Sequence, residues 1–230
     1  MAAVMMVVAP HPDDAELGMG GTIAAMITSG SRVIVVDLSD GEPTPHGSLE
    51  IRARETAAAS KVLGITDRIQ LGLKNREIFD TVENRKLLAS KIREYKPTIL
   101  FAPYWDDAHP DHIEACKLVE GARFYSKFVK GDLAGEPHYP RKLLHFFSTH
   151  IRPRFEPAFV FDINNTIDQK MKSIECYESQ FKHNPKNAEI IDAIRGEASY
   201  WGRQVQSSFG EPFVCRESIR LANVSTLTEL

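Results

Sequence analysis

The chain has 230 residues, of which 43% are hydrophobic and 26% are charged, and its formal net charge is -3 with the histidines neutral. Lysine and arginine are interspersed with acidic residues and form no long run, which argues against a nucleic-acid surface. A chain of this length and composition buries a full core, and we expect a single α/β domain over residues 1–230.

The first apolar run, VMMVV at residues 4–8, is too short to span a bilayer and follows no basic leader. We therefore expect neither a signal peptide nor a membrane partner, and the sequence predicts a cytoplasmic protein. The cysteines, Cys116, Cys176 and Cys215, are widely spaced and form no CxxC pair. This spacing predicts free thiols rather than disulfides or a zinc knuckle.

Short apolar runs alternate with longer segments of helical period, which is typical of βαβ units and a parallel sheet. We expect strands at residues 4–9, 32–38, 68–71, 98–102, 143–147 and 159–163. We expect helices at residues 20–29, 49–63, 82–95, 167–181 and 188–206, and another that starts near Pro110. Residues 131–140 predict an exposed loop, and residues 211–221 a tail that folds back onto the body. The expected fold class is α/β, a Rossmann-like and mostly parallel sheet with helices on both faces.

Two polar clusters follow predicted strands. The first, APHPDDAE at residues 9–16, comes directly after a buried strand, where unpaired carboxylates carry a heavy desolvation cost unless they hold a cation. The second, HPDH at residues 109–112, follows the fourth strand after a short loop. The usual strand order of a doubly wound sheet, 3-2-1-4, makes the first and fourth strands neighbours whose carboxyl ends flank a ligand-binding crevice. We therefore expect the two clusters to face each other.

Three residues of these clusters are candidate metal ligands. His11, Asp14 and His112 offer two imidazoles and one carboxylate, a set that suits Zn²⁺ with water in an open fourth position. Fe²⁺ could fill the same triad, which is also the ligand set of non-haem iron oxygenases. The oxygenase is the less favoured interpretation, because its ligands are expected on an all-β jelly roll rather than on strand-to-helix turns.

The remaining polar residues suggest how a hydrolytic reaction would run. A carboxylate beside a metal-bound water can take its proton as the water attacks a carbonyl, and Asp13 fits this role of general base. His109, oriented by Asp111 and kept charged by it, is expected to stabilise the oxyanion and to protonate the leaving amine. The clusters therefore predict a metal-dependent amide hydrolase. In a non-catalytic nucleotide-binding module, Asp13 and His109 would have no role.

The glycine-rich stretch LGMGGT at residues 17–22 suggests dinucleotide binding as another alternative. A GxGxxG pattern starting at Gly18 would require glycine at Ile23, and HPDD occupies the turn where a pyrophosphate would lie. The glycines are instead expected to permit a tight turn and close packing of a helix on the sheet.

Several neighbours of the clusters carry weaker signals. Tyr104 and Trp105 could stack on a sugar, although burial against the loop is the favoured interpretation. Asp106 and Asp107 are expected to be solvated or to cap the next helix. Glu16 either fixes a metal ligand from outside or lies on the surface at a helix start.

The two polar clusters and the residues around them resemble the motifs of a known family. PHPDDAELGMGGT and FAPYWDDAHPDH are similar to motifs of the PIG-L or LmbE-like zinc deacetylases, which remove the acetyl group from N-acetylglucosamine conjugates. The chain looks most like the bacillithiol-pathway type, which acts on N-acetylglucosaminyl malate. The similarity extends to DLSDGE, LEIR and YESQF, and therefore covers most of the chain.

The resemblance implies the same roles as the chemistry: zinc binding at His11, Asp14 and His112, general base catalysis at Asp13, and transition-state stabilisation at His109. It also implies a small-molecule N-acetylglucosamine conjugate as partner, and a homo-oligomer, either a trimer or a hexamer.

Two further positions bear on the substrate. Arg52, in LEIR, matches an arginine implicated in substrate binding, where a guanidinium could pair a carboxylate in two-pronged fashion. The alternative is a solvated helix arginine. Ala108 stands where the bacillithiol-type enzymes have arginine, which removes an anion contact. The resemblance implies malate as the aglycone, and another N-acetylated glycoside or amide, without this anion contact, is the alternative substrate.

Overall fold

The computed structural model describes residues 3–150, 154–183, 187 and 189–220. Within these residues one sheet of seven strands has the order β3-β2-β1-β4-β5-β7-β6. The strands are β1 (Val4–Ala9), β2 (Arg32–Ser39), β3 (Asp67–Leu73), β4 (Ile99–Pro103), β5 (Lys142–Phe146), β6 (Phe159–Asp162) and β7 (Gly210–Val214). The helices are α1 (Asp14–Thr28), α2 (Leu49–Leu63), α3 (Val82–Tyr95), α4 (Pro110–Tyr125), α5 (Ile167–Glu175), α6 (Glu178–Phe181) and α7 (Ile190–Gln204). The first five strands pair in parallel, whereas β7 pairs antiparallel with β5 and β6.

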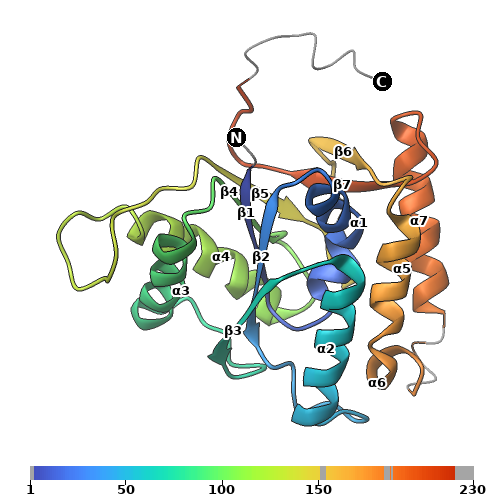
Figure 1. Cartoon of the computed structure of the whole chain (residues 1–230), viewed down its shortest axis with the longest axis horizontal. Helices are drawn as coiled ribbons and strands as arrows, with labels where there is room; N and C mark the ends of the chain where they lie inside the picture. Colours follow the sequence, from blue (N-terminus) through green and yellow to red (C-terminus); the bar gives the residue numbers. More distant parts are fainter. Residues whose placement is uncertain (1–2, 151–153, 184–186, 188, 221–230) are drawn as a thin grey trace.

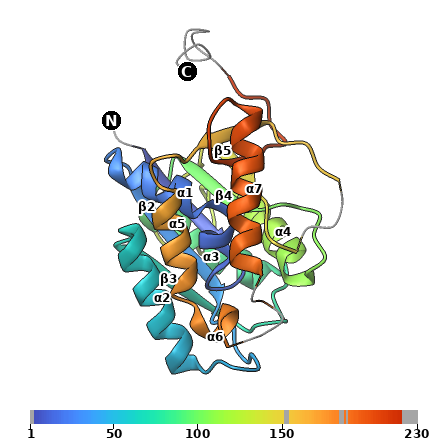
Figure 2. The same cartoon turned by 90° about the vertical axis from the view of Figure 1, so that its right-hand side faces the viewer.

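The alternation of side chains along β1 explains why both faces of the sheet are covered. Met6 and Val8 belong to a core shared with α3 and α4, and Met5 and Val7 belong to a second core shared with α1. Figure 1 shows α3 and α4 on one side of the sheet and α1, α2, α5 and α7 on the other. In the turned view of Figure 2, α5 and α7 lie side by side, packed through a third apolar cluster. The predicted α/β class with helices on both faces is confirmed.

Local capping signals explain why two helices have the predicted bounds. Ser48 and Thr81 precede α2 and α3, and each side chain accepts a hydrogen bond from a backbone N–H of the first turn. The helix α2 ends at Leu63 and is capped by Gly64, whose φ of 79° is the left-handed conformation that glycine tolerates. The helix α4 begins at Pro110, as expected, and residues 131–140 form a loop.

Other elements differ from the prediction. The helix α1 begins at Asp14, directly after the first polar cluster, rather than at residue 20. The expected helix at residues 167–181 is two helices, α5 and α6. The predicted start of the last helix, Ala188, lies outside the described residues, and α7 begins at Ile190. The expected tail, residues 211–221, includes most of the strand β7. This strand was not predicted because it contains Pro212, and proline is unusual within a sheet.

A buried ion pair stabilises a kink in α1. Met19 has non-helical angles, φ -151° and ψ 25°, and the kink leaves backbone groups without helical partners. Lys170 Nζ, on α5, donates to the Leu17 carbonyl at 2.7 Å and to Glu211 Oε1 at 2.6 Å. The Glu211 carboxylate, on β7, accepts from the N–H groups of Gly21 and Thr22 at 3.0 and 2.7 Å. The pair therefore joins three elements across the broken turn of α1.

Alanine at Gly21 should lower the free energy of unfolding by about 1–3 kcal/mol, the usual effect of overpacking. A Cβ at residue 21 would lie 2.8 Å from Cδ1 of Ile163 and 2.9 Å from its Cβ. Helix α1 and the segment that contains Ile163 would therefore have to move apart. Urea denaturation measures the change. Gly196→Ala is the matched control, because a Cβ at this helical position meets nothing within 4 Å. The control should be stabilising by up to about 1 kcal/mol, and equal losses in both variants would contradict the packing argument.

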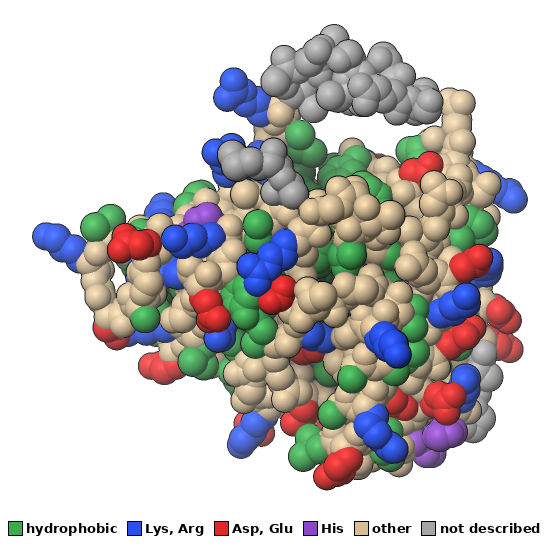
Figure 3. All heavy atoms as spheres, viewed as in Figure 1, with side chains coloured by type: hydrophobic (Ala, Val, Ile, Leu, Met, Phe, Trp, Pro, Cys, Tyr) green, Lys and Arg blue, Asp and Glu red, His purple; other side chains and the backbone are tan. Residues whose placement is uncertain are grey.

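The surface has mixed charge. Figure 3 shows acidic and basic side chains interspersed over the visible face. Of the helices that the structure describes, none is both long enough and apolar enough to cross a bilayer.

Candidate active site

The carboxyl ends of β1 and β4 bring the two polar clusters together. These strands pair in parallel, as the strand order predicted, and each leads into a turn that opens a helix. One ring nitrogen each of His11 and His112 and one carboxylate oxygen of Asp14 lie within 4.8 Å of one another, and all three residues are buried. The clusters thus face each other, and metal binding by these three residues remains a prediction.

The arrangement of these three side chains favours a positive charge at their centre. Oδ2 of Asp14 lies 3.1 Å from Nδ1 of His11 and 3.4 Å from Nε2 of His112. Burial alone would lower the pKa of both imidazoles, but the surrounding carboxylates raise it to about 9 for His11 and about 10 for His112. Either protons on the imidazoles or a bound metal ion can supply this positive charge. The imidazole and carboxylate donors fit a Zn²⁺ ion.

The outer nitrogen of each imidazole is held by a second carboxylate. Nε2 of His11 lies 3.0 Å from Oδ2 of Asp111. Nδ1 of His112 lies 3.0 Å from Oδ2 of Asp107 and 3.0 Å from Oγ of Ser148, which itself donates to Asp107. These contacts fix the ring orientation and leave Nδ1 of His11 and Nε2 of His112 toward Asp14. Such outer carboxylates are typical of histidines that bind metals.

Two predictions about these carboxylates were wrong. Asp107 is neither solvated nor the cap of α4, which is His109: it is buried, contacts His112 and accepts the His109 backbone N–H at 2.8 Å, whereas Asp106 is exposed as expected. Asp111 was expected to orient His109, but its Oδ2 contacts His11 and accepts the backbone N–H of Arg76 at 2.8 Å. The partners of Asp111 come from turns that are distant along the chain and adjacent in space, which sequence spacing does not show.

Asparagine at Asp107 should weaken metal binding by about 10–100-fold, the usual effect of losing an outer carboxylate. An amide cannot supply the negative charge that keeps the proton on Nδ1 of His112. A competitive chelator titration measures the dissociation constant. Asp106→Asn makes the same chemical change on the exposed neighbour and should have no effect; an equal loss in that variant would rule out a specific role for Asp107.

Asp13 occupies a strained turn beside the three candidate ligands. Its φ of 113° is rarely adopted by a residue other than glycine, and such strain is often retained at functional sites. Arg52 Nη1 donates to Asp13 Oδ2 at 3.0 Å, and its Nε lies 3.6 Å from Oε1 of Glu42. Burial raises the pKa of Asp13 to about 7, although the Arg52 charge opposes this rise. A carboxylate with such a pKa is well suited to accept and release a proton.

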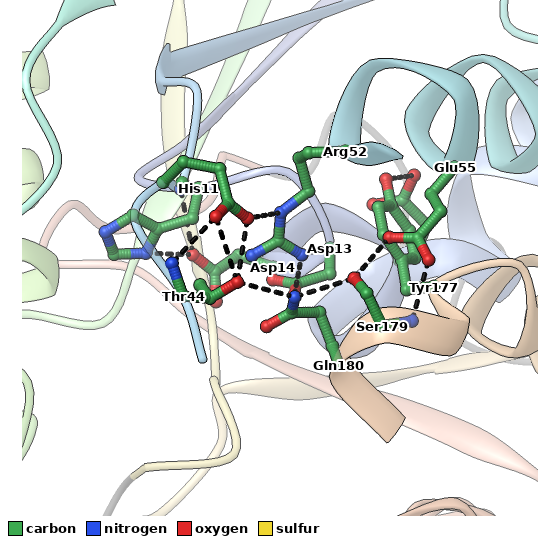
Figure 4. Close-up of polar contacts among 12 residues, drawn as sticks. His11, Asp13, Asp14, Thr44, Arg52, Glu55, Tyr177, Ser179 and Gln180 are labelled. Carbon is green, nitrogen blue, oxygen red and sulfur yellow. Dashed lines mark hydrogen bonds and ion pairs between the residues drawn. The ribbon is translucent and has the colours of Figure 1, made fainter. Parts of the chain in front are cut away.

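Arg52 is not the solvated helix arginine of the alternative interpretation. It is 4% exposed and its guanidinium reaches the Asp13 carboxylate, as Figure 4 shows. Both residues line a cavity of about 240 Å³ together with His11, Asp14 and His109. Substrate binding by Arg52 remains a prediction, and the contact that the structure shows is with Asp13.

His109 has a defined proton arrangement. Its Nδ1 accepts the backbone N–H of Asp111 at 3.2 Å, so a neutral ring carries its hydrogen on Nε2. Burial and the neighbouring His112 lower the pKa of His109. The expectation that His109 is held in its charged form is therefore not supported by this geometry.

Several residues for which no role was predicted support this site. In Figure 4, Gln180 Nε2 donates to Thr44 Oγ1 at 3.1 Å, and Ser179 Oγ donates to Glu55 at 2.7 Å, which attaches α6 to α2 and to the loop before it. Glu16, for which two alternatives were predicted, is not on the surface, and among the described residues its carboxylate contacts Arg68 and Tyr177 rather than a candidate ligand. It is fully buried and pairs with Arg68 at 2.5 Å.

Tyr104 and Trp105 pack on each other with ring centroids 4.4 Å apart. Tyr104 also packs on Phe147, and Trp105 on His145. These contacts agree with the favoured interpretation of burial against the loop.

The fold and the site define an α/β protein with a candidate mononuclear metal centre at the switch point of its sheet. Residues 6–122 match the family model PIG-L, GlcNAc-PI de-N-acetylase. The chain is 30% identical to the diacetylchitobiose deacetylase of Thermococcus kodakarensis over 223 residues, which cover 90% of this chain and 80% of the relative. The chain belongs to the PIG-L family.

Two further comparisons agree with this assignment. The probable N-acetyl-alpha-D-glucosaminyl L-malate deacetylase 2 of Bacillus anthracis is 25% identical, with 77% of this chain and 81% of that protein covered. The crystal structure of the conserved protein TT1542 from Thermus thermophilus superposes with a TM-score of 0.88 at 35% identity, and 96% of this chain and 97% of that chain are covered. The family and the fold expected from the sequence motifs are thereby confirmed.

Proposed function

We propose that this chain is a metal-dependent deacetylase that hydrolyses the N-acetyl group of an N-acetylglucosamine conjugate. The observation that carries this proposal is the convergence of His11, Asp14 and His112 beside the half-buried carboxylate of Asp13, in one cavity. Membership of a family of de-N-acetylases supports the amide as the bond that is broken and the amino sugar as the substrate class.

His11, Asp14 and His112 are the residues that would hold the metal ion, with Zn²⁺ as the proposed occupant and Fe²⁺ as the alternative. When bound, the ion would polarise the amide carbonyl and lower the pKa of a water. The carboxylates of Asp107 and Asp111 orient the two imidazoles from outside.

The other residues move protons and stabilise charge. Asp13 takes the proton of the attacking water and passes it to the nitrogen of the leaving amine, while Arg52 holds the carboxylate in place. Because the Asp111 backbone N–H occupies Nδ1 of His109, the Nε2–H is the donor for the developing oxyanion. In this proposal a neutral His109 stabilises the oxyanion, and the proton for the amine comes from Asp13.

The conjugated group is proposed to be neutral rather than malate. Ala108 offers no cation to a carboxylate, and the relative from Thermococcus kodakarensis, at 30% identity, is a diacetylchitobiose deacetylase. The Bacillus anthracis relative, whose name specifies malate, is 25% identical.

A substrate panel tests the proposal. Amine release is measured for diacetylchitobiose, N-acetylglucosaminyl malate and the inositol conjugate of N-acetylglucosamine, with metal-analysed protein. We expect release from all three to depend on the metal and kcat/KM to be greatest for diacetylchitobiose. A preference for malate would overturn the assignment of the aglycone, and no release from any N-acetylglucosaminide would overturn the function. Activity under strict anaerobiosis excludes an oxygenase.

A further inference from the structure

A second group of metal-binding side chains lies on α4 and β5, apart from the candidate active site. Cys116 and Glu120 are four residues apart and therefore share one face of α4, and His145 faces them from β5. Cys116 Sγ lies 3.9 Å from Glu120 Oε1, and His145 Nε2 lies 3.7 Å from the same oxygen. All three ligand atoms lie within 4.8 Å of one another.

His145 is the independent observation that points to a ligand here. Its side chain is 1% exposed, yet neither ring nitrogen has a hydrogen-bond partner among the described residues. The separation of 3.7 Å from Glu120 is too long for a hydrogen bond. A buried polar group without a partner is destabilising by about 1–3 kcal/mol, so such a group calls for a function.

We propose that Cys116, Glu120 and His145 form a second metal site, which binds Zn²⁺ through sulfur, oxygen and nitrogen with one position open. A tetrahedral zinc ion holds such ligands roughly 3.3–3.6 Å apart, given Zn–S and Zn–N distances of about 2.3 and 2.0 Å. The two separations to Glu120 Oε1, 3.7 and 3.9 Å, exceed this spacing by a few tenths of an ångström, and the separation of Cys116 Sγ from the His145 nitrogen is at most 4.8 Å, so the side chains must close on the ion. On binding, the Cys116 thiol loses its proton to solvent and no oxidation occurs.

The metal must displace one arginine. Arg216 Nε lies 3.1 Å from Glu120 Oε1, and its guanidinium stacks over Trp105 with its central carbon 4.3 Å from the ring centroid. The Arg216 side chain is 54% exposed, and an exposed ion pair contributes little to stability, so it can move into solvent. The neighbouring charges of Arg123 and Glu217 pair with each other at 2.7 Å and stay balanced.

A cavity of about 230 Å³ reaches Glu120 and His145, whereas Cys116 is buried and does not line it. Glu120, His145 and Arg216 line it, together with Arg123 and Glu217. The site is chemically distinct from the first, because His11, Asp14 and His112 include no thiolate.

Cobalt spectroscopy tests the site directly. Titration of the full-length protein with Co²⁺ should give a near-ultraviolet band from thiolate-to-cobalt charge transfer, which a nitrogen and oxygen site cannot produce. Cys116→Ser should abolish the band, and His145→Phe should weaken the binding that produces it by about tenfold or more. Cys176→Ser and Cys215→Ser are the matched controls and should leave the band unchanged. Absence of the band in the wild type, or its loss only in Cys215→Ser, would overturn the proposal.

Stability provides a second measurement, which decides the question if Cys116→Ser fails to fold. His145→Phe removes two unsatisfied nitrogens and retains a ring against Trp105. Without metal, its free energy of unfolding should equal or exceed that of the wild type. With Zn²⁺, the wild type should gain more stability than the variant, and the difference isolates this site from the first. An equal gain in both proteins would refute a role for His145 as a ligand.

Discussion

Alanine at His11 or at His112 should leave the first site without its metal and reduce deacetylation by at least about 10³-fold. Each variant removes one of three candidate protein ligands, and the remaining pair cannot hold a divalent ion firmly. A Lewis acid contributes several kcal/mol to the stabilisation of the transition state, and each 1.36 kcal/mol is a factor of ten in rate. Metal content by elemental analysis and kcat/KM for amine release measure the two effects.

Metal bound at the first site must be measured apart from metal bound at the proposed second site. Metal is counted in the Cys116→Ser background, which removes the second candidate site, so the loss refers to His11 and His112 alone. His183→Ala serves as the control, because His183 is exposed and lies outside the cluster. Full metal content in His11→Ala would contradict the assignment of ligands, even if activity were lost.

The meeting of the two clusters could be predicted because it depends on topology. Parallel strands joined by helices favour the order 3-2-1-4, and this order alone places the turn after β1 beside the turn after β4. The bounds of helices α2 and α3 could be predicted to the residue because their caps are adjacent in sequence. Ser48 and Thr81 cap the two N-termini, and Gly64 caps the C-terminus of α2. Information of this kind is local or periodic, and a single sequence contains it.

The supporting contacts could not be predicted, because they depend on pairs that are distant along the chain. Asp111 contacts His11, which lies 100 residues earlier in the chain, rather than the nearby His109 that it was expected to orient. Lys170 and Glu211 are 41 residues apart in the chain, yet they are buried together where α1 is kinked. Nothing in either local sequence indicates that the other residue lies 2.6 Å away.

Asparagine at Asp13 should reduce kcat by about 10²–10⁴-fold while the metal stays bound. Asp13 lies beside the candidate ligands but belongs to a different pair, with Arg52, so the change removes a proton acceptor rather than a ligand. Asparagine is the informative substitution because it tolerates positive φ better than most residues and can still accept the Arg52 hydrogen bond. Alanine would leave the buried guanidinium with less compensation and confuse a loss of stability with a loss of catalysis.

Comparison of this variant with the ligand variants tests the division of roles at the site. Asp13→Asn should bind metal like the wild type, unfold at a similar urea concentration, and fail in turnover, with kcat reduced and KM little changed. Asp106→Asn, the same chemical change on an exposed neighbour, should be fully active. If Asp13→Asn instead loses metal together with His11→Ala, then Asp13 is part of the ligand set and the proton must be accepted elsewhere. If it keeps both metal and turnover, the proposed general base is wrong, although the metal site and the fold would stand.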